Sequence, residues 1–306
     1  MLMRAWLFAL LITLPAGCAP SNERPPARVT LVAVGDVLLC RGVGKQIGKH
    51  GADWLFDDTR HVLKGGDVAF CNLECPLSKR GVAHKRRFLF RADPTLANSL
   101  HSNGLSVISL ANNHTLDYGR DAMLDTIEAL RDAGMVSVGA GRDGDEASRL
   151  RIVTKHGLRV GFLAFVDLAS YGVVTLPDRP TVSCVDSQTL PGQIRAAKAK
   201  CDVLVVSFHW GVEYMRRPTE RQRKLARICI DNGADLILGH HPHVLQPVET
   251  YKGKPIAYSM GGFIWDGRTL GSGRSAIYKF ELGRSSARLS TTMPVAITAC
   301  QPRLVR

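Results

Sequence analysis

Residues 234–243 read Ala-Asp-Leu-Ile-Leu-Gly-His-His-Pro-His, an apolar run that ends in three of the chain's ten histidines. A short run of branched residues is typical of a strand buried on both faces of a parallel sheet. Neutral imidazole is the commonest metal ligand in proteins. His241 and His243 are alternate residues, so they can reach two neighbouring ions if the backbone turns after the strand. The alternative is a solvated polar loop.

Four further apolar runs end in polar residues that can bind a metal. They are Val29–Val34 before Gly35-Asp36, Asp67–Cys71 before Asn72-Leu73-Glu74, Leu105–Leu110 before Ala111-Asn112-Asn113-His114, and Val203–Phe208 before His209-Trp210-Gly211. In open α/β sheets the ligand site lies beyond the carboxyl ends of the strands. We therefore expect the five junctions to converge on one pocket.

Each of these polar residues also has a structural interpretation when taken singly. Asp36 fits a turn after Gly35, and Asn113 fits an Asx-turn. Asp117 fits the cap of the next helix. A single His209 is more often an interior histidine with satisfied hydrogen bonds than a ligand. The functional prediction therefore depends on the set and not on any one residue.

Six motifs follow one another along the chain in a fixed order. They are Gly35-Asp36, Asn72-Leu73-Glu74, Ala111-Asn112-Asn113-His114-x-x-Asp117-Tyr118-Gly119, His209-Trp210-Gly211-x-Glu213, Gly239-His240-His241-Pro242-His243-Val244 and Ala257-Tyr258-Ser259-Met260-Gly261-Gly262-Phe263. Together they resemble the CapA family of poly-γ-glutamate capsule biosynthesis proteins, from about Val29 to Asp266. The last motif departs from the family pattern, because Gly262 stands where the family usually has Asn.

The resemblance implies a fold and a set of roles. The fold would be the four-layer α/β/β/α sandwich of the calcineurin-like metallophosphoesterases, with two mixed sheets flanked by helices. Asp36 and His243 would hold one ion, and Glu74 would bridge it to a second ion, whose ligands would be Asn113, His209 and His241. His114 would be the catalytic residue that donates a proton to the leaving oxygen. Weaker candidates for substrate binding are Arg41, Glu213, His240, Lys85 and Arg86.

The ligand types bear on the metals and their chemistry. Mixed oxygen and nitrogen ligation suits divalent manganese, zinc or iron, and no thiolate is required. Two such ions, about 3.5–4 Å apart, polarise a phosphoryl oxygen and lower the pKa of a bridging water. We therefore expect two transition-metal ions as cofactors.

Residues 1–17 are predicted to be an export signal. An apolar stretch from Ala5 to Leu14 follows one basic residue, and about ten such residues are too few to span a bilayer. Ala16-Gly17-Cys18 resembles the end of a bacterial lipobox, although Pro15 stands where that box normally has Leu. Lipidation of Cys18 is therefore expected, with simple cleavage as the alternative. Residues 18–28, rich in proline, would form a flexible tether.

These features predict the location and organisation of the mature chain. We expect a lipoprotein on the periplasmic side of the bacterial envelope membrane, or a secreted protein if Cys18 is not lipidated. Residues 29–298 would form one domain, and residues 299–306 a basic tail. The cysteines after Cys18 show no close spacing apart from Cys71 and Cys75, so we expect buried small side chains or a local disulfide.

Periodicity supports an α/β domain. A helix is expected from Asp121 to Ala133, and Thr219-x-x-Gln222 is a capping box for a helix that runs to Gly233. After Gly239 four short strands are expected, with a hairpin turn at Lys252-Gly253. They cover Val244–Tyr251, Pro255–Met260, Ala276–Leu282 and Ala287–Met293. We expect these late strands to form a second sheet packed on the first.

The formal net charge of +13 favours polyanions and anionic surfaces. The basic run from Lys79 to Arg87 is a candidate groove wall, with a solvated loop as the alternative. A nucleic-acid partner is not expected, because no aromatics are interleaved with the run and export removes the usual partners. Other capsule-biosynthesis proteins are possible partners.

Two functions fit these observations. The first is an exported protein of capsule or exopolymer biosynthesis whose two metal ions hydrolyse a phosphoester or act on an anionic polymer. The second is a non-catalytic protein that binds or assembles a polyanion and uses metal for structure. His114 favours the enzyme, because a purely structural metal site does not need a histidine there. Fold resemblance alone does not choose the reaction.

Overall fold

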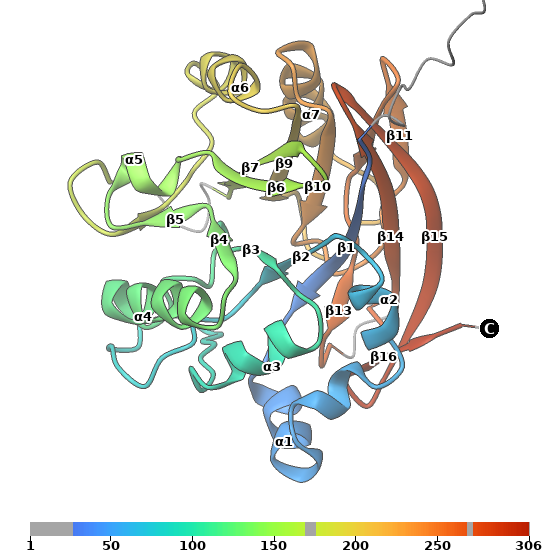
Figure 1. The fold of residues 1–306 in the computed structure, drawn as a ribbon. Helices are drawn as coiled ribbons and strands as arrows, with labels where there is room; N and C mark the ends of the chain where they lie inside the picture. Colours follow the sequence, from blue (N-terminus) through green and yellow to red (C-terminus); the bar gives the residue numbers. More distant parts are fainter. Residues whose placement is uncertain (1–26, 169–175, 268–271, 306) are drawn as a thin grey trace, which may run out of the picture.

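The computed structural model describes residues 27–168, 176–267 and 272–305. Within these ranges two large β-sheets pack face to face, and helices cover their outer faces (Figure 1). The four-layer α/β/β/α architecture predicted from the sequence is therefore confirmed. The expected export signal, Cys18 and nearly all of the expected tether lie outside the described residues.

The larger sheet has eight strands arranged around β1 (Val29–Val37). Its order is β16-β15-β14-β1-β2-β3-β4, and β13 also pairs with β1. The strands β1 to β4 run parallel, whereas β14, β15 and β16 are antiparallel to their neighbours. The other bounds are β2 Val68–Leu73, β3 Val107–Ser109, β4 Val136–Val138, β13 Gly262–Ile264, β14 Arg274–Gly283, β15 Ser286–Thr298 and β16 Gln301–Leu304.

The smaller sheet has six strands in the order β11-β12-β10-β9-β7-β6. Its centre, β12, β10, β9 and β7, is parallel. The bounds are β6 Arg151–Lys155, β7 Leu158–Asp167, β9 Val203–Trp210, β10 Leu236–His240, β11 Val248–Tyr251 and β12 Lys254–Ala257. A separate two-stranded ribbon joins β5 (Ala140–Gly141) and β8 (Thr181–Val182).

The late strands do not form a sheet of their own, so that prediction was wrong. β11 and β12 extend the smaller sheet beside β10, whereas β14 and β15 pair with β1 in the larger sheet. Hydrophobic alternation gives the faces of a strand but not its neighbour, because backbone hydrogen bonds carry no sequence information. The hairpin turn at Lys252-Gly253 is confirmed, with positive φ at both residues. Residues 301–304, placed in a basic tail from the sequence, form the edge strand β16.

One core cluster lies between the sheets and joins side chains that are distant in sequence. Phe70 on β2 stacks on Phe162 on β7, with ring centroids 6.0 Å apart. Leu31 of β1 and Val205 of β9 are also fully buried in this layer. Alternate residues of the same strands, such as Val32 and Val206, face the helices on either side, so each central strand is buried on both faces.

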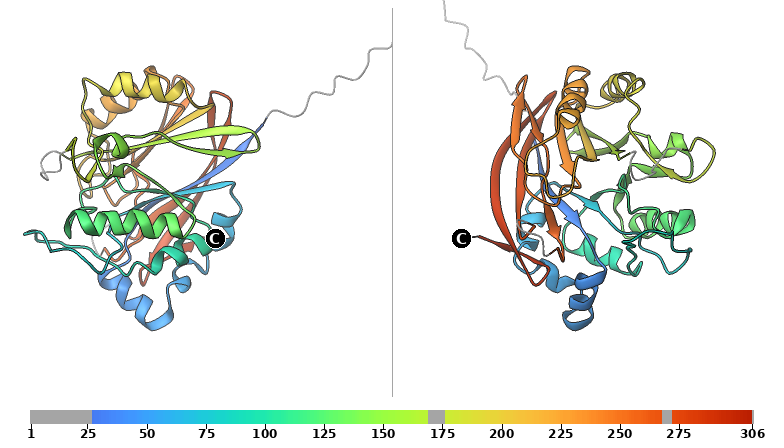
Figure 2. Two further views of the ribbon diagram at one scale, coloured as in Figure 1. Left: turned by 60° about the vertical axis from the view of Figure 1, so that its left-hand side comes forward. Right: turned by 180° about the vertical axis from the view of Figure 1, so that it is seen from behind.

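Helices cover both outer faces (Figures 1 and 2). On the larger sheet lie α1 (Arg41–His50), α2 (Arg60–Lys64), α3 (Leu96–Ser102), α4 (Gly119–Asp132) and a 3₁₀ turn (Asp53–Phe56). On the smaller sheet lie α6 (Leu190–Lys198) and α7 (Glu220–Asp231), while α5 (Gly144–Ala147) packs on the ribbon. The predicted capping box at Thr219 is present. Within the described ranges, every helix is too short or too polar to cross a bilayer.

Candidate metal centre

The five predicted junctions meet at one end of the sandwich. Parallel register places Asp36 of β1 beside Asn72 of β2, and His209 of β9 beside His240 of β10. Because the two sheets pack face to face, the carboxyl ends of these strands also meet across the layers. Asp36 of the larger sheet thus contacts His243, which follows β10 of the smaller one, at 3.0 Å between Oδ2 and Nδ1.

Asp36 is fully buried and held by four neighbours. Asn72 donates a hydrogen bond to Oδ1 at 2.8 Å, and the backbone N–H of His241 donates to Oδ2 at 3.3 Å. Nδ1 of His240 lies 3.3 Å from Oδ1. Burial opposes ionisation of Asp36, but the imidazoles of His240 and His243 outweigh it and hold the pKa well below its ordinary value. This carboxylate is therefore ionised at neutral pH.

Glu74 follows β2 and is the least satisfied group of the site. Its side chain is 1% exposed, and neither carboxylate oxygen has a hydrogen-bond partner among the described residues. Nε2 of His243 lies 3.6 Å from Oε1, and the Nε2 atoms of His114 and His209 lie 3.9 and 4.0 Å away. Burial, reinforced by the charge of Asp36, raises the pKa of Glu74 well above its ordinary value. A buried carboxylate without partners is costly unless a cation joins it.

His209, His241 and Asn113 form a second set of donor atoms. Nε2 of His209 lies 2.8 Å from Oδ1 of Asn113 and 3.1 Å from Nδ1 of His241. Burial, with the neighbouring His241, holds the pKa of His209 well below its ordinary value. Burial also lowers the pKa of His241 to about 3. Both rings are therefore neutral at pH 7 and keep the lone pairs that a metal ion requires.

The loop after β10 is bent sharply to present its histidines. His241 and His243 adopt positive φ angles of 95° and 54°, a region that residues other than glycine rarely occupy. The carbonyl of Pro242 between them accepts a hydrogen bond from the N–H of Tyr214 at 2.8 Å. The ring of Trp265 stacks on His243 with centroids 4.1 Å apart. Such strain is characteristic of functional sites, where the surrounding contacts maintain it.

His114 is oriented by an acid on the same turn. Its Nδ1 lies 2.8 Å from Oδ2 of Asp117, and its ring stacks on Phe90 with centroids 4.0 Å apart. Nε2 on the opposite side of the ring faces Glu74 and the centre. Asp117 also accepts from the backbone N–H of Phe90 at 2.8 Å. The sequence indicated Asp117 only as a helix cap, whereas the structure makes it the partner of His114.

Two asparagines connect the loops behind the ligands. Asn112 donates to Asn72 Oδ1 at 3.0 Å and to the carbonyl of Leu73 at 2.8 Å. Its own Oδ1 accepts from the N–H of His114 at 3.0 Å. Asn72 in turn lies between Asp36 and His209, 3.3 Å from Nδ1 of the latter. This amide network positions ligand residues from both sheets.

Two triads of ligand atoms lie close enough to hold a metal ion each. One is Asp36, Glu74 and His209, and the other is Glu213, His241 and His243, with the atoms of each set within 4.8 Å of one another. This division differs from the one that the family resemblance implies, and it adds Glu213, which was expected to contact substrate. The donor set of carboxylate oxygens and neutral imidazoles fits divalent transition metals.

The expected substrate-binding residues take different positions. Arg41 reaches Asp266 at 3.2 Å and lies over the rings of Phe88 and Phe90, and His240 is buried against Asp36. Arg86 donates to the carbonyl of Asn113 at 2.8 Å, so it borders the centre. Lys85 is exposed on the same loop.

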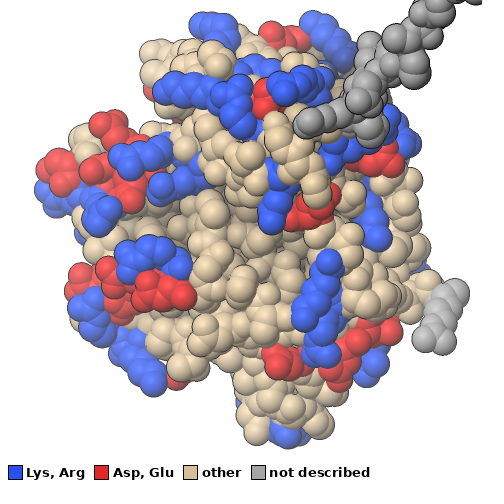
Figure 3. Space-filling model, viewed as in Figure 1, with Lys and Arg blue, Asp and Glu red and all other residues tan. Residues whose placement is uncertain are grey.

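The basic run is partly neutralised by acidic neighbours. Lys79 pairs with Asp93 at 3.2 Å, and Arg80 binds Asp125 through two nitrogens. On the face shown in Figure 3, lysine and arginine side chains lie mostly around the periphery with acidic residues among them. The net positive charge is therefore not gathered into one patch on that face. Of the two interpretations of the run, a groove wall is supported at its middle, where residues 81–84 and residues 118–121 line an open pocket of about 340 Å³.

Gly262, the departure from the family motif, lies on β13 beside Asp36. A Cβ atom at this position would come within 2.8 Å of Cβ and Cγ of Trp265. The glycine thus makes room for the indole that stacks on His243. A larger residue at position 262 would require Trp265 to move.

A groove beside the centre was not predicted from the sequence. Its volume is about 930 Å³, and its walls include Arg41, Lys45 and Lys49 of α1 together with Trp265 and Asp266. Residues four apart lie on one helix face and rise about 6 Å along the axis, so the three cations form a row. The spacing of Arg41, Lys45 and Lys49 was the available signal. That spacing does not by itself predict a groove, because the opposite wall, with Trp265 and Asp266, comes from a segment distant in sequence.

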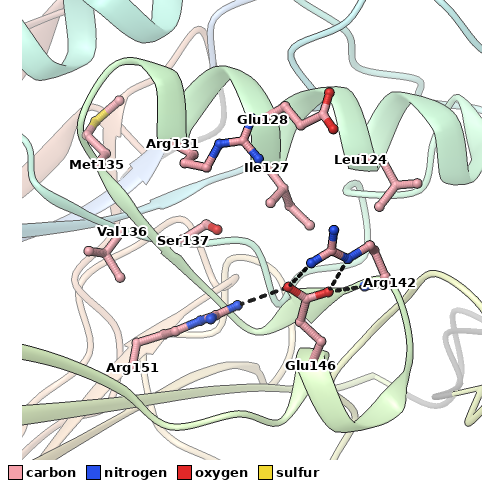
Figure 4. A pocket seen from close by; sticks show the side chains of 10 residues that line it. All are labelled: Leu124, Ile127, Glu128, Arg131, Met135, Val136, Ser137, Arg142, Glu146 and Arg151. Atoms are coloured by element: carbon pink, nitrogen blue, oxygen red, sulfur yellow. Dashed lines mark hydrogen bonds and ion pairs between the residues drawn. The ribbon is translucent and has the colours of Figure 1, made fainter.

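A second pocket, of about 230 Å³, lies between α4 and the ribbon region (Figure 4). Its acidic residue Glu146 is already paired with Arg142 at 3.0 Å and with Arg151 at 3.7 Å. In contrast to Glu74, this carboxylate is balanced by the chain itself.

Comparison with known proteins identifies relatives of this chain. Residues 30–267 match a family described as bacterial capsule synthesis protein PGA_cap. The chain is 32% identical over 295 residues to the capsule biosynthesis protein CapA of Bacillus anthracis, and the match covers 94% of this chain and 72% of that protein. It is also 32% identical over 276 residues to the PGA biosynthesis protein CapA of Bacillus subtilis (strain 168), covering 89% and 73%.

A solved structure with the same fold is the calcineurin-like phosphoesterase YfkN from Bacillus subtilis. It has a TM-score of 0.51 and 15% sequence identity, and the match covers 88% of this chain and 90% of that one. At this identity the likeness concerns the fold alone.

Proposed function

We propose that this chain, which belongs to the bacterial capsule synthesis protein family, is a metal-dependent hydrolase of the cell envelope. Its substrate would be a phosphoester or the anionic capsule polymer itself. The relatives named above act in capsule or PGA biosynthesis, and the chain has the fold of calcineurin-like phosphoesterases. Family and fold leave the reaction open, so the proposal depends on the site.

The observation that carries the proposal is the buried, unpartnered carboxylate of Glu74 among three imidazoles. The residues that would hold two divalent ions are Asp36, Glu74, Asn113, His209, His241 and His243, with Glu213 at the exposed side. When bound, such ions supply Lewis acidity at a phosphoryl oxygen and make water a better nucleophile at neutral pH.

His114 would move the proton. Asp117 fixes one ring nitrogen and Phe90 fixes the ring plane, so Nε2 is held toward Glu74 and the space where a substrate would lie. A positioned acid near a leaving oxygen typically contributes about 10²–10⁴-fold to the rate. A site that binds metal only for structure has no use for this arrangement.

A second function, binding or assembly of a polyanion without catalysis, is favoured by the α1 groove. The row of Arg41, Lys45 and Lys49 lies beside the metal centre and can meet anionic groups that repeat along a polymer. In the hydrolase proposal, the same groove would hold the chain on which the centre acts.

The deciding experiment separates metal binding from chemistry. Purified protein is reconstituted with Mn²⁺, Zn²⁺ or Fe²⁺ and assayed on small phosphoesters and on anionic polymers. His114→Ala should keep the bound metal and the fold but lose about 10²–10⁴-fold in turnover. If His114→Ala supports capsule formation as well as wild type, while Lys45→Gln with Lys49→Gln does not, the hydrolase proposal is wrong and the binding function stands.

We also propose export and lipidation at Cys18, on the sequence pattern of residues 1–18. Labelled palmitate should enter the wild-type chain in a bacterial host, and Cys18→Ser should release the protein from the membrane fraction. Membrane association that persists in Cys18→Ser, with no label in the wild type, would contradict lipidation.

A further inference from the structure

Large apolar side chains that are exposed to solvent gather at the mouth of the metal centre. Seven are exposed among the described residues, and five of them lie on two loops. Loop 79–89 carries Val82 and Phe88, which are 82% and 53% exposed, and loop 211–218 carries Val212, Tyr214 and Met215. Exposed apolar clusters on soluble proteins mark interaction sites. The two exceptions, Ile152 and Val305, lie elsewhere and serve as controls below.

Both loops border the centre, one from each sheet. Loop 79–89 lies beyond the end of β2, and His84 donates its N–H to the carbonyl of Asp117 at 2.9 Å. Loop 211–218 begins directly after β9, and the ring of Tyr214 lies 6.1 Å from that of His243. Neither loop contains a helix or a strand. The apolar side chains therefore flank the entrance to the ligand residues on two sides.

Exposed cations alternate with these apolar residues. Lys85 and Arg87 are exposed beside Phe88, and the Arg87 guanidinium lies 5.2 Å from the centroid of that ring. Arg216 and Arg217 are exposed directly after Met215. Aliphatic and aromatic side chains mixed with lysine and arginine are typical of segments that enter the interface of an anionic bilayer. The two loops thus offer a bilayer both apolar side chains that can insert and cations that can bind its anionic headgroups.

We propose that this rim, the exposed residues of loops 79–89 and 211–218, docks the mouth of the metal centre onto an anionic lipid bilayer. A stable protein interface needs a continuous, closely packed surface of about 800 Å² on each partner. A fluid bilayer accepts separate side chains from two irregular loops, and its headgroups neutralise the arginines between them. The proposal goes beyond the proposed hydrolase function and does not depend on catalysis. It places the centre where a membrane-borne substrate or polymer end would meet it.

Vesicle flotation tests the proposal, with the full chain carrying Cys18→Ser so that no acyl chain contributes. The probes are vesicles of phosphatidylcholine alone and vesicles that also contain phosphatidylglycerol. Val82→Ser with Met215→Ser should lower partitioning onto the anionic vesicles about tenfold or more, since inserted apolar area drives interfacial binding. The matched control, Ile152→Ser with Val305→Ser, should partition like the parent chain.

Charge is tested separately. Arg216→Gln with Arg217→Gln should weaken binding to anionic vesicles about tenfold or more, because both cations lose their attraction to the anionic headgroups. Lys200→Gln with Lys224→Gln removes two exposed lysines on the helical side and should change little.

Two results would overturn the proposal. One is a parent chain that fails to bind anionic vesicles, or binds phosphatidylcholine alone equally well. The other is equal partitioning of the rim variants and their controls. If the rim variants then still abolish capsule formation in cells, the loops serve a protein partner instead of the bilayer.

Discussion

A buried carboxylate lies near each end of strand β10: Asp235 directly precedes the strand, and Glu74 contacts the loop that follows it. At its amino end, Asp235 accepts hydrogen bonds from Lys198 at 2.7 Å, from Lys254 at 2.6 Å and from the N–H of Leu204 at 2.9 Å. At its carboxyl end, the loop with His241 and His243 lies against Glu74, whose oxygens have no hydrogen-bond partner among the described residues. Both acids are almost fully buried.

The difference separates a structural acid from a ligand-binding one. Two lysines from neighbouring elements balance the charge of Asp235, so that cluster is complete without any other molecule. The neighbours of Glu74 are the imidazoles of His114, His209 and His243, of which His209 is neutral at pH 7 and compensates a carboxylate weakly. A buried carboxylate that the chain does not balance has to take up either a proton or a cation from outside.

The largest effect is expected from removing a ligand at the carboxyl end. His241→Ala should lose bound metal and lower activity to background, because the ring contacts His209 and belongs to one of the two ligand triads. Elemental analysis and turnover are the measurements. His61→Ala, on an exposed position of α2, is the control and should keep both. Full metal content in His241→Ala would contradict the assignment.

At the amino end the expected effect is on stability. Asp235→Ala leaves two lysines without their acid and should lower the free energy of unfolding by about 3 kcal/mol, with metal content unchanged. The matched control is Asp231→Ala, which removes an exposed acid paired with Lys252 and should cost about 0–1 kcal/mol. Denaturant unfolding measures both. Equal losses in the two variants would show that Asp235 is not the structural centre described above.

Glu74→Gln should behave in the opposite way to Asp235→Ala. In metal-free protein it removes an unbalanced charge and should raise the free energy of unfolding by about 1–3 kcal/mol. The pKa of Glu74 is raised in the folded state, so its protonation stabilises the fold at low pH. That stability is lost as the pH rises above the ordinary value of 4.5 through the folded pKa. The difference in free energy of unfolding between Glu74→Gln and wild type, both free of metal, should therefore grow as the pH rises from 4.5 through the folded pKa of Glu74.

Added metal should reverse the order of stability. Wild type should gain stability on addition of Mn²⁺ or Zn²⁺, whereas Glu74→Gln should gain less. If metal-free Glu74→Gln is less stable than metal-free wild type at every pH above 4.5, the charge of Glu74 is not unbalanced in the fold.

Much of the site was predictable because it lies at strand ends. The apolar runs before Asp36, Glu74 and His209 predicted strands, and the rule that ligands gather at carboxyl ends predicted their convergence. The helix after Thr219 was also predicted, because a capping box is a local signal. Assignment of Glu213 to a triad was not predicted, because that residue lies in an irregular loop after β9 and its approach to His241 depends on tertiary packing.

The sequence by itself determined parts of the local structure, namely the strands that lead to Asp36, Glu74 and His209, the helix after Thr219 and the turn at Lys252-Gly253. Such features follow from periodicity, capping and turn residues, which act over a few positions. Only the tertiary structure decided the division of the late strands between two sheets, the balance of Asp235 and the isolation of Glu74. These depend on contacts such as Lys198 with Asp235, whose partners lie 37 positions apart, and no local pattern records them.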